Sequence, residues 1–294
     1  MLTYENCRLC PRQCAVDRSK DERGFCKMPG RLTAAKAMLH YGEEPCLCGD
    51  APTGAVFFSG CTLRCAYCQN AEISLGCMGQ ALSPQRLREI FLELIEAGAS
   101  SIDLVTPTQF LPDILPALYP KLPVPVIYNC GGYESVETLR ALEGLVDIYL
   151  PDFKYSDNAL AQRLSGAKDY QEVACAALRE MYRQTGTPIY DQTGKMTRGM
   201  LIRHLVLPGN VDNSLGVIDL IDELFPKHDV PISLMSQYVP MGDLKAPLDR
   251  SVSEEEYAAV LSWMDFCGLT EGYRQELNSA TKEMLPDFNF EGII

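Results

Sequence analysis

The chain has 294 residues, 22% of them charged, and a formal net charge of −13 at pH 7. This acidic balance argues against nucleic acid as a partner, because nucleic acid binding needs a basic surface. No apolar run approaches the roughly 20 residues that cross a bilayer, and the N-terminus lacks the layout of a secretory signal. We therefore expect a cytoplasmic protein with no membrane partner.

The thirteen cysteines are concentrated near the N-terminus, with nine of them in the first 68 residues. An odd count without an export signal argues against a disulfide scaffold, and clustered cysteines in a reducing compartment are more often metal ligands. The remaining four are scattered, and we expect them to be ordinary buried residues: Cys77, Cys130, Cys175 and Cys267.

Residues 1–50 are rich in cysteine, glycine and charge and show no long hydrophobic period. We interpret them as a small Cys-rich N-terminal extension that binds metal. Four cysteines within twenty residues provide its candidate ligands: Cys7, Cys10, Cys14 and Cys26. Four thiolates suit either zinc or an iron–sulfur cluster, and free or regulatory thiols are the alternative. Cys46 and Cys48 are alternative ligands.

Residues 51–294 alternate between strand-like and helix-like segments. Short apolar runs predict buried strands at 55–59, 102–106, 124–129, 147–150, 201–207 and 232–235. Amphipathic periods with capping residues predict helices at about 84–97, 135–143, 169–184, 214–225 and 253–267. Such alternation implies parallel βαβ units. Six units predict an α/β fold with a partial (β/α)6 TIM-like barrel; a doubly wound sheet is the alternative.

The segment after the first predicted strand has the most informative pattern, C-x3-C-x2-C, formed by Cys61, Cys65 and Cys68. In a barrel of parallel strands, the loops that follow the strands carry the ligands and the chemistry. Three thiolates can bind three irons of a [4Fe–4S] cluster and leave the fourth iron open, as open metal sites do in catalysis. A zinc site or a closed ferredoxin cluster, with Cys77 as its fourth ligand, is the alternative.

This triplet, with Tyr67 directly before its third cysteine, resembles the motif of the radical S-adenosylmethionine (SAM) superfamily, and most closely its pyruvate formate-lyase activating enzyme-like branch. The resemblance implies a [4Fe–4S] cluster whose open iron binds SAM. It also implies reductive cleavage of SAM to a 5′-deoxyadenosyl radical, which abstracts hydrogen from a substrate. Tyr67 would then lie against the adenine.

The resemblance extends over most of residues 54–285 and implies further SAM contacts at the ends of later strands. These are Asp152 and Lys154 after the fourth strand, Arg203 on the fifth, and Tyr238 after the sixth, near the ribose. A Lys or Arg in an apolar strand needs a partner when buried. A bound carboxylate ligand would supply one; a structural ion pair is the alternative. The irregular stretch 238–252 could cover the site.

One departure from the family concerns the segment after the second strand, where the family commonly carries Gly-Gly-Glu to bind the SAM amino group. Here the sequence is Thr106-Pro-Thr108-Gln-Phe. The hydroxyls of Thr106 and Thr108, or backbone carbonyls, are the candidate acceptors in its place. These variants resemble a less characterised branch of activating enzymes, whose substrate the sequence does not identify.

We therefore predict a radical SAM enzyme, an oxidoreductase that takes an electron from an external donor such as flavodoxin or ferredoxin. Its substrate would be a glycyl-radical protein, in the manner of an activating enzyme, or a small molecule or peptide. A different class of protein is the alternative: a non-catalytic iron–sulfur electron carrier or a zinc-binding adaptor. In that case Lys154 and Arg203 would be incidental.

Overall fold

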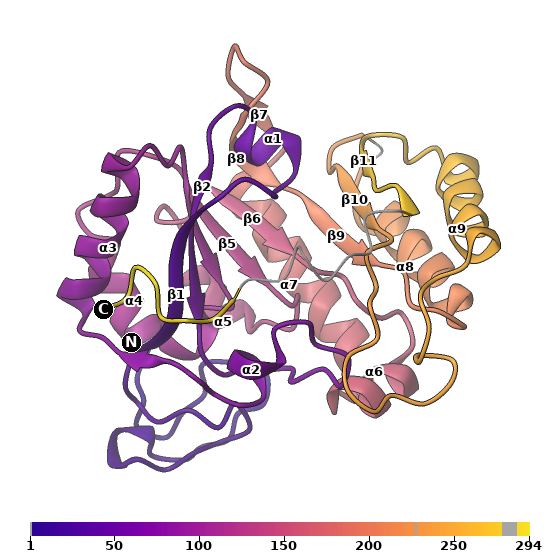
Figure 1. Ribbon diagram of the computed structural model, residues 1–294. Helices are drawn as coiled ribbons and strands as arrows, with labels where there is room; N and C mark the ends of the chain where they lie inside the picture. Colours follow the sequence, from indigo (N-terminus) through magenta and orange to yellow (C-terminus); the bar gives the residue numbers. More distant parts are fainter. Residues whose placement is uncertain (1, 227, 278–286) are drawn as a thin grey trace.

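A computed structural model describes residues 2–226, 228–277 and 287–294 (Figure 1). Its strands, in chain order, are β1 Thr33–His40, β2 Thr53–Phe58, β3 Gln80–Ala81, β4 Ile102–Val105, β5 Val126–Cys130, β6 Ile148–Pro151, β7 Ile189–Tyr190, β8 Met196–Met200, β9 Ile202–Leu205, β10 Ile232–Met235 and β11 Gly272–Arg274. Its helices are α1 Pro45–Cys48, α2 Ala71–Ser74, α3 Pro84–Glu96, α4 Leu111–Ala117, α5 Val136–Arg140, α6 Asn158–Ser165, α7 Tyr170–Thr185, α8 Val211–Leu224 and α9 Glu254–Cys267. Two short 3-10 turns, η1 Arg18–Lys20 and η2 Thr108–Phe110, complete the elements.

The strands form a sheet of eight in the order β3-β1-β2-β4-β5-β6-β8-β7, and a sheet of three in the order β11-β10-β9. Neighbours along β2-β4-β5-β6 are parallel, as are β9 and β10. A parallel bridge between Asp152 and Arg203 connects the end of β6 to β9. Six parallel strands therefore follow one another as β2-β4-β5-β6-β9-β10, which is an α/β arrangement of the partial-barrel kind.

All six predicted strands are present. Most of these apolar runs are buried on both faces as in a parallel sheet, whereas in β9 buried and partly exposed residues alternate. The helices also agree with their predicted positions. The Ser83 side chain caps α3 by accepting a hydrogen bond from the backbone of Arg86, with Pro84 at the first helical position. Ser253 and Glu256 form the predicted capping box of α9. Within the described residues, no helix has both the length and the apolar character needed to cross a bilayer.

Residues 1–50 contain a strand that their sequence did not indicate, β1, which pairs antiparallel with β2 along most of its length. Ala34, Ala35 and Ala37 are buried there. Alanine has a low strand propensity, so the segment lacks the β-branched and aromatic residues that mark a strand in a sequence. The pairing places residues 33–40 in the main sheet. The division of the chain near residue 50 stays a prediction.

The two ends of the parallel strands carry different structures (Figure 1). The segment that contains the cysteine triplet and α2 follows the carboxyl end of β2. The helix α1 lies at the opposite end, because β1 runs antiparallel to β2 and delivers the chain to the beginning of that strand. The interior of the barrel is therefore approached by the cysteine loop from one end and by residues 41–48 from the other.

Candidate active site

A cavity of about 270 Å³ lies inside the barrel and reaches the cysteine loop. All three cysteines of the triplet line it, as do five of the seven predicted SAM-binding residues: Tyr67, Thr106, Asp152, Lys154 and Arg203. The structure thus brings together residues from four strand ends that lie up to about 140 positions apart in the sequence. Thr108 and Tyr238 do not line this cavity.

The cysteine loop is shaped by a tight approach at Gly60, directly before Cys61. Gly60 has a φ of +74°, and a side chain there would begin 2.2 Å from Met28 Cγ, so only glycine fits without displacing its neighbour. The Gly60 backbone donates to the carbonyl of Ile73, 2.8 Å away, which fixes the beginning of the loop against its end. This closure turns the three cysteines toward the cavity.

The three thiols lie close enough to affect one another's ionisation. Burial, together with the neighbouring charges of Cys65 and Cys68, raises the pKa of the Cys61 thiol to about 12. Burial and Cys65 also raise the pKa of Cys68. Cys61 and Cys68, which hold their protons more tightly than ordinary thiols, form with Cys65 a site where a bound cation would deprotonate them.

The donor set fits a cluster of several irons. Across residues 2–226, 228–277 and 287–294, no three His, Cys, Asp or Glu side chains are arranged to hold a single metal ion. An iron–sulfur cluster does not require such convergence, because each cysteine binds a different iron. Cys77 does not line the cavity; its sulfur contacts the guanidinium of Arg64 and the carbonyl of Cys26 instead.

Lys154 and Asp152 form an ion pair on the wall of the cavity, with 2.5 Å between Nζ and Oδ2. Burial alone would lower the pKa of Lys154, but the negative charges of Asp152 and Cys65 outweigh it and hold the pKa well above its ordinary value. Lys154 is therefore a permanent cation that faces the cysteine loop. Both side chains remain partly accessible, so a ligand in the cavity can contact them.

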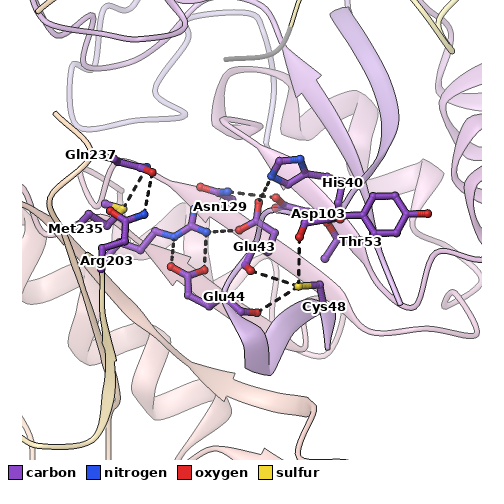
Figure 2. A network of polar contacts seen from close by, with 12 residues as sticks. His40, Glu43, Glu44, Cys48, Thr53, Asp103, Asn129, Arg203, Met235 and Gln237 are labelled. Carbon is purple, nitrogen blue, oxygen red and sulfur yellow. Dashed lines mark hydrogen bonds and ion pairs between the residues drawn. The ribbon is translucent and has the colours of Figure 1, made fainter. Parts of the chain in front are cut away.

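Arg203 is held by two glutamates that follow β1, as Figure 2 shows. Its Nε and Nη2 donate to the two carboxylate oxygens of Glu44, at 2.7 and 2.6 Å, and Nη2 also contacts Glu43. The three side chains are only 15%, 8% and 6% exposed. Burial would raise the pKa of Glu44, but the Arg203 charge prevails and lowers it. This bidentate ion pair is of the strong, geometrically specific kind.

A third carboxyl group, Asp103 on β4, is buried completely beside this network. Asn129 donates to its Oδ2 at 3.2 Å, whereas Oδ1 has no hydrogen-bond partner within the part of the chain that the structure describes. Burial and the neighbouring charge of Glu43 raise the pKa of Asp103 well above its ordinary value. Burial therefore favours the protonated form of Asp103, which lies beside Glu43.

Four further polar residues line the cavity without a role predicted from the sequence: His40, Glu43, Asn129 and Gln237. His40 lies 3.6 Å from Glu43 through Nε2. Glu43 and Glu44 stand in a short polar segment that looks like a surface loop in the sequence. A run of two acidic residues was the signal available in the sequence, and it does not indicate burial.

Thr106 lies at the cavity in a strained backbone conformation, with a φ of +57°. A β-branched residue in this region is unusual and costs about 1–3 kcal/mol, as is common at functional sites. Its carbonyl accepts a hydrogen bond of 2.8 Å from the side chain of Gln109, which also donates to the carbonyls of Ser59 and Gly60. Gln109 thus connects the turn after β4 to the beginning of the cysteine loop.

Thr108 lies away from the cavity, in a buried polar cluster with Glu134 and Tyr128. Its hydroxyl donates to Glu134 Oε1 at 2.9 Å and lies 2.9 Å from the hydroxyl of Tyr128. Burial raises the pKa of Glu134 to about 8, even though hydrogen bonds from Thr108 and Tyr128 oppose the shift. Thr108 is positioned to satisfy this buried acid.

Replacing Glu134 by glutamine is expected to change how stability depends on pH. Between about pH 4.5 and 8, the folded wild type keeps a proton that the unfolded chain loses, so its stability falls as pH rises. The neutral glutamine removes this loss, and the variant should gain roughly 3–5 kcal/mol over the wild type by pH 8. Urea unfolding at pH 5, 7 and 9 measures the difference. A difference that stays constant across this range would contradict the buried, raised pKa.

Tyr238 packs behind the cavity wall. Its ring lies 6.1 Å from that of Tyr67, and its hydroxyl donates to the carbonyl of Leu248 at 2.7 Å. Tyr67 itself accepts a hydrogen bond of 2.9 Å from the hydroxyl of Tyr155. Tyr238 therefore anchors the irregular stretch 238–252 beside Tyr67, while the preceding residue, Gln237, faces the cavity.

The four N-terminal cysteines line a second, much smaller enclosed cavity. A side chain at Gly24 would begin 2.7 Å from Cys14 Sγ, so this glycine allows the two segments to approach. Cys7 Sγ receives a contact from Arg18, and Cys14 Sγ accepts a hydrogen bond of 3.2 Å from the backbone of Phe25. Cys46 and Cys48 lie elsewhere, on α1. The quartet is thus gathered in one place, and its binding of a metal stays a prediction.

The strand order and the cysteine-lined cavity define an α/β protein built on a partial barrel of parallel strands. Crystal structures of Streptococcus suis SuiB have a similar fold: the complex with the precursor peptide SuiA at 12% identity, and SuiB alone at 11%, each with a TM-score of 0.51. Each alignment covers 76% of this chain and 49% of SuiB, so this chain spans about half of that protein's length. SuiB has also been crystallised with S-adenosylmethionine bound. At these identities, the likeness establishes the fold.

Among curated proteins, the uncharacterised protein MJ0674 of Methanocaldococcus jannaschii is 29% identical over 271 residues. That alignment covers 88% of this chain and 74% of MJ0674. No model of a known protein family matches the chain.

Proposed function

We propose that this chain is a radical SAM enzyme whose [4Fe–4S] cluster is held by Cys61, Cys65 and Cys68. One observation carries the proposal: the three cysteines share a single cavity with the Asp152–Lys154 ion pair. A closed electron-transfer cluster or a zinc adaptor would not require a charged pair, or a cavity of this size, beside its metal. The partial-barrel fold, which SuiB shares, supports the proposal.

When bound, the cluster would supply one electron that cleaves SAM to methionine and a 5′-deoxyadenosyl radical, which takes a hydrogen atom from the substrate. The protein contributes positioning and the exclusion of water. Asp152 and Lys154 present opposite charges to the cavity, which complement the ammonium and carboxylate of the methionine part of SAM. Tyr67, buried beside the third cysteine, offers a flat apolar surface to the adenine.

Thr106 is our candidate for the position where the family carries Gly-Gly-Glu. Its strained backbone turns the chain at the edge of the cavity, and Gln109 holds its carbonyl. The family resemblance implies that Arg203 contacts SAM. In this structure its Nε and Nη2 already bind Glu44 and Glu43. The nitrogen Nη1 is not part of these contacts and is the atom we assign to a ligand carboxylate.

The reductant and the substrate complete the proposal. A one-electron donor such as flavodoxin or ferredoxin would reduce the cluster, and the substrate would be a glycyl-radical protein, as for an activating enzyme, or a smaller molecule. SuiB has been determined with a precursor peptide bound, so a protein with this fold accepts a peptide. A gene for a glycyl-radical enzyme beside this one would favour the activating role.

The reaction is tested on protein reconstituted anaerobically with iron and sulfide. With dithionite and SAM, we expect release of 5′-deoxyadenosine and methionine in equal amounts, measured by liquid chromatography. Omission of dithionite should stop the release, because cleavage requires an electron. Protein that takes up no cluster would overturn the proposal, and protein that loads a cluster and binds SAM without cleaving it would favour a non-catalytic carrier.

We also propose that Cys7, Cys10, Cys14 and Cys26 bind a second metal. Replacing both Cys7 and Cys10 by serine should remove about one zinc or about four irons per chain, depending on which the site holds. Elemental analysis of protein purified without reconstitution measures the loss. The matched control replaces Cys46 and Cys48, which lie on α1. An equal metal content in all three proteins would exclude the site.

A further inference from the structure

Two serines direct their hydroxyl groups at the sulfurs of the cysteine triplet. Ser165 Oγ donates to Cys65 Sγ at 3.0 Å, and Ser74 Oγ donates to Cys68 Sγ at 3.1 Å. Both serines are buried, at 3% and 6% exposure. Each is the last residue of a helix, Ser165 of α6 and Ser74 of α2. Two of the three candidate ligands thus have a side-chain donor.

The surroundings of Ser165 hold it in this position. Its backbone carbonyl accepts a hydrogen bond of 2.7 Å from Arg12, and the neighbouring Leu164 carbonyl accepts one of 2.8 Å from the backbone of Ala66, inside the cysteine loop. The end of α6 is therefore attached directly to the loop. Ser165 Oγ also lies 2.7 Å from the hydroxyl of Tyr155. A metal-bound thiolate is only an acceptor, so the hydrogen shared with Cys65 must come from the serine.

We propose that Ser165 and Ser74 raise the reduction potential of the cluster held by the triplet. This inference rests on the proposed function. Reduction adds an electron whose charge is partly carried by the ligand sulfurs, so a hydrogen bond to those sulfurs stabilises the reduced form more than the oxidised form. Hydrogen bonds to charged groups are stronger than neutral ones, and burial keeps water from replacing them. Among the described residues, Cys61 is contacted by backbone groups, those of Leu63 at 3.4 Å and of Arg64.

The two serines are positioning residues, which act through the cysteines and not on the substrate. A purely structural role would affect stability and loading of the cluster, but not its potential. The potential therefore separates the two interpretations, and it is measured per loaded cluster, so partial loading does not distort it.

The experiment compares reconstituted wild type with Ser165→Ala, Ser74→Ala and the double variant, by redox titration followed by EPR of the reduced cluster. We expect each single variant to have a more negative midpoint. In the double variant, the ratio of reduced to oxidised cluster at a fixed poise should fall about tenfold, or 59 mV for one electron. Ser165→Thr and Ser74→Thr keep the hydroxyl, so their midpoints should lie closer to that of the wild type than those of the alanine variants.

Ser214→Ala is the matched control, because Ser214 is equally buried but bonds to His204; its midpoint should equal that of the wild type. Midpoints of both alanine variants that coincide with the wild type would overturn the inference while leaving the proposed function intact. If one alanine variant does not load a cluster, the other carries the test. Wild-type protein that takes up no cluster would instead overturn the proposed function, and this inference with it.

Discussion

Replacement of Cys65 by alanine is expected to abolish SAM cleavage by the reconstituted protein. Cys65 is the most buried of the three thiols, and it contacts Ser165 while its charge acts on Lys154. Loss of a partner around a metal site already costs 10–100-fold in metal affinity or activity, so loss of a ligand should cost at least about 100-fold. Release of 5′-deoxyadenosine and the visible absorbance of the cluster measure the effect.

Cys77→Ala is the control for this prediction. Cys77 follows the triplet by nine residues but does not line the cavity, so its removal should leave both cluster loading and 5′-deoxyadenosine release close to wild type. The reverse result, with Cys77 essential and Cys65 dispensable, would mean that a different set of cysteines holds the cluster. Equal loss in both variants would indicate a closed four-cysteine cluster.

Replacement of Arg203 by methionine is expected to destabilise the fold by about 3–5 kcal/mol at pH 7, because two buried carboxylates lose their counter-charge. Glu43 and Glu44 are 6% and 8% exposed, so water cannot replace the guanidinium. The loss of unfolding free energy should be smaller at pH 5, because Glu43 and Glu44, without the Arg203 charge, can then take up protons. Urea unfolding at both pH values measures the free energy.

The control for this prediction is Arg183→Met. Arg183 also contacts two glutamates, Glu143 and Glu180, but it is 51% exposed, so its loss should cost at most about 1 kcal/mol. A compensated variant, with methionine at 203 and glutamine at 43 and 44, should recover much of the lost stability. If Arg203→Met lowers the unfolding free energy no more than Arg183→Met does, another group must balance the charges of Glu43 and Glu44.

Much of the fold could be predicted from the sequence where a single physical signal dominated. The strands β2, β4, β5, β6 and β10 are buried along most of both faces, which produces short continuous apolar runs. The strand β1 did not carry this signal, because its buried positions are mostly alanine. Strand character there comes from pairing with β2, and pairing is a tertiary property that a local pattern does not contain.

The candidate site was predictable where residues lie close together in the sequence or end a strand. The cysteine triplet lies within eight residues of sequence, and Asp152 and Lys154 follow the end of β6; all five residues line the cavity. The sequence does not show that Thr106 lines the cavity and Thr108 does not. The chain turns at the positive φ of Thr106 into η2, so the two side chains reach different surroundings. The direction of a loop side chain depends on such backbone turns, which the sequence pattern does not specify.

The Glu44–Arg203 ion pair closes a chain segment of 159 residues, which bears on the order of folding during synthesis. The N-terminal segment leaves the ribosome first, but its carboxylates have no counter-charge until β9 has been made. They must stay hydrated for most of translation, and the entropy of closing so long a segment is overcome only after the barrel strands have paired. The attachment of residues 43 and 44 to β9, at the end of the barrel occupied by α1, is therefore a late event.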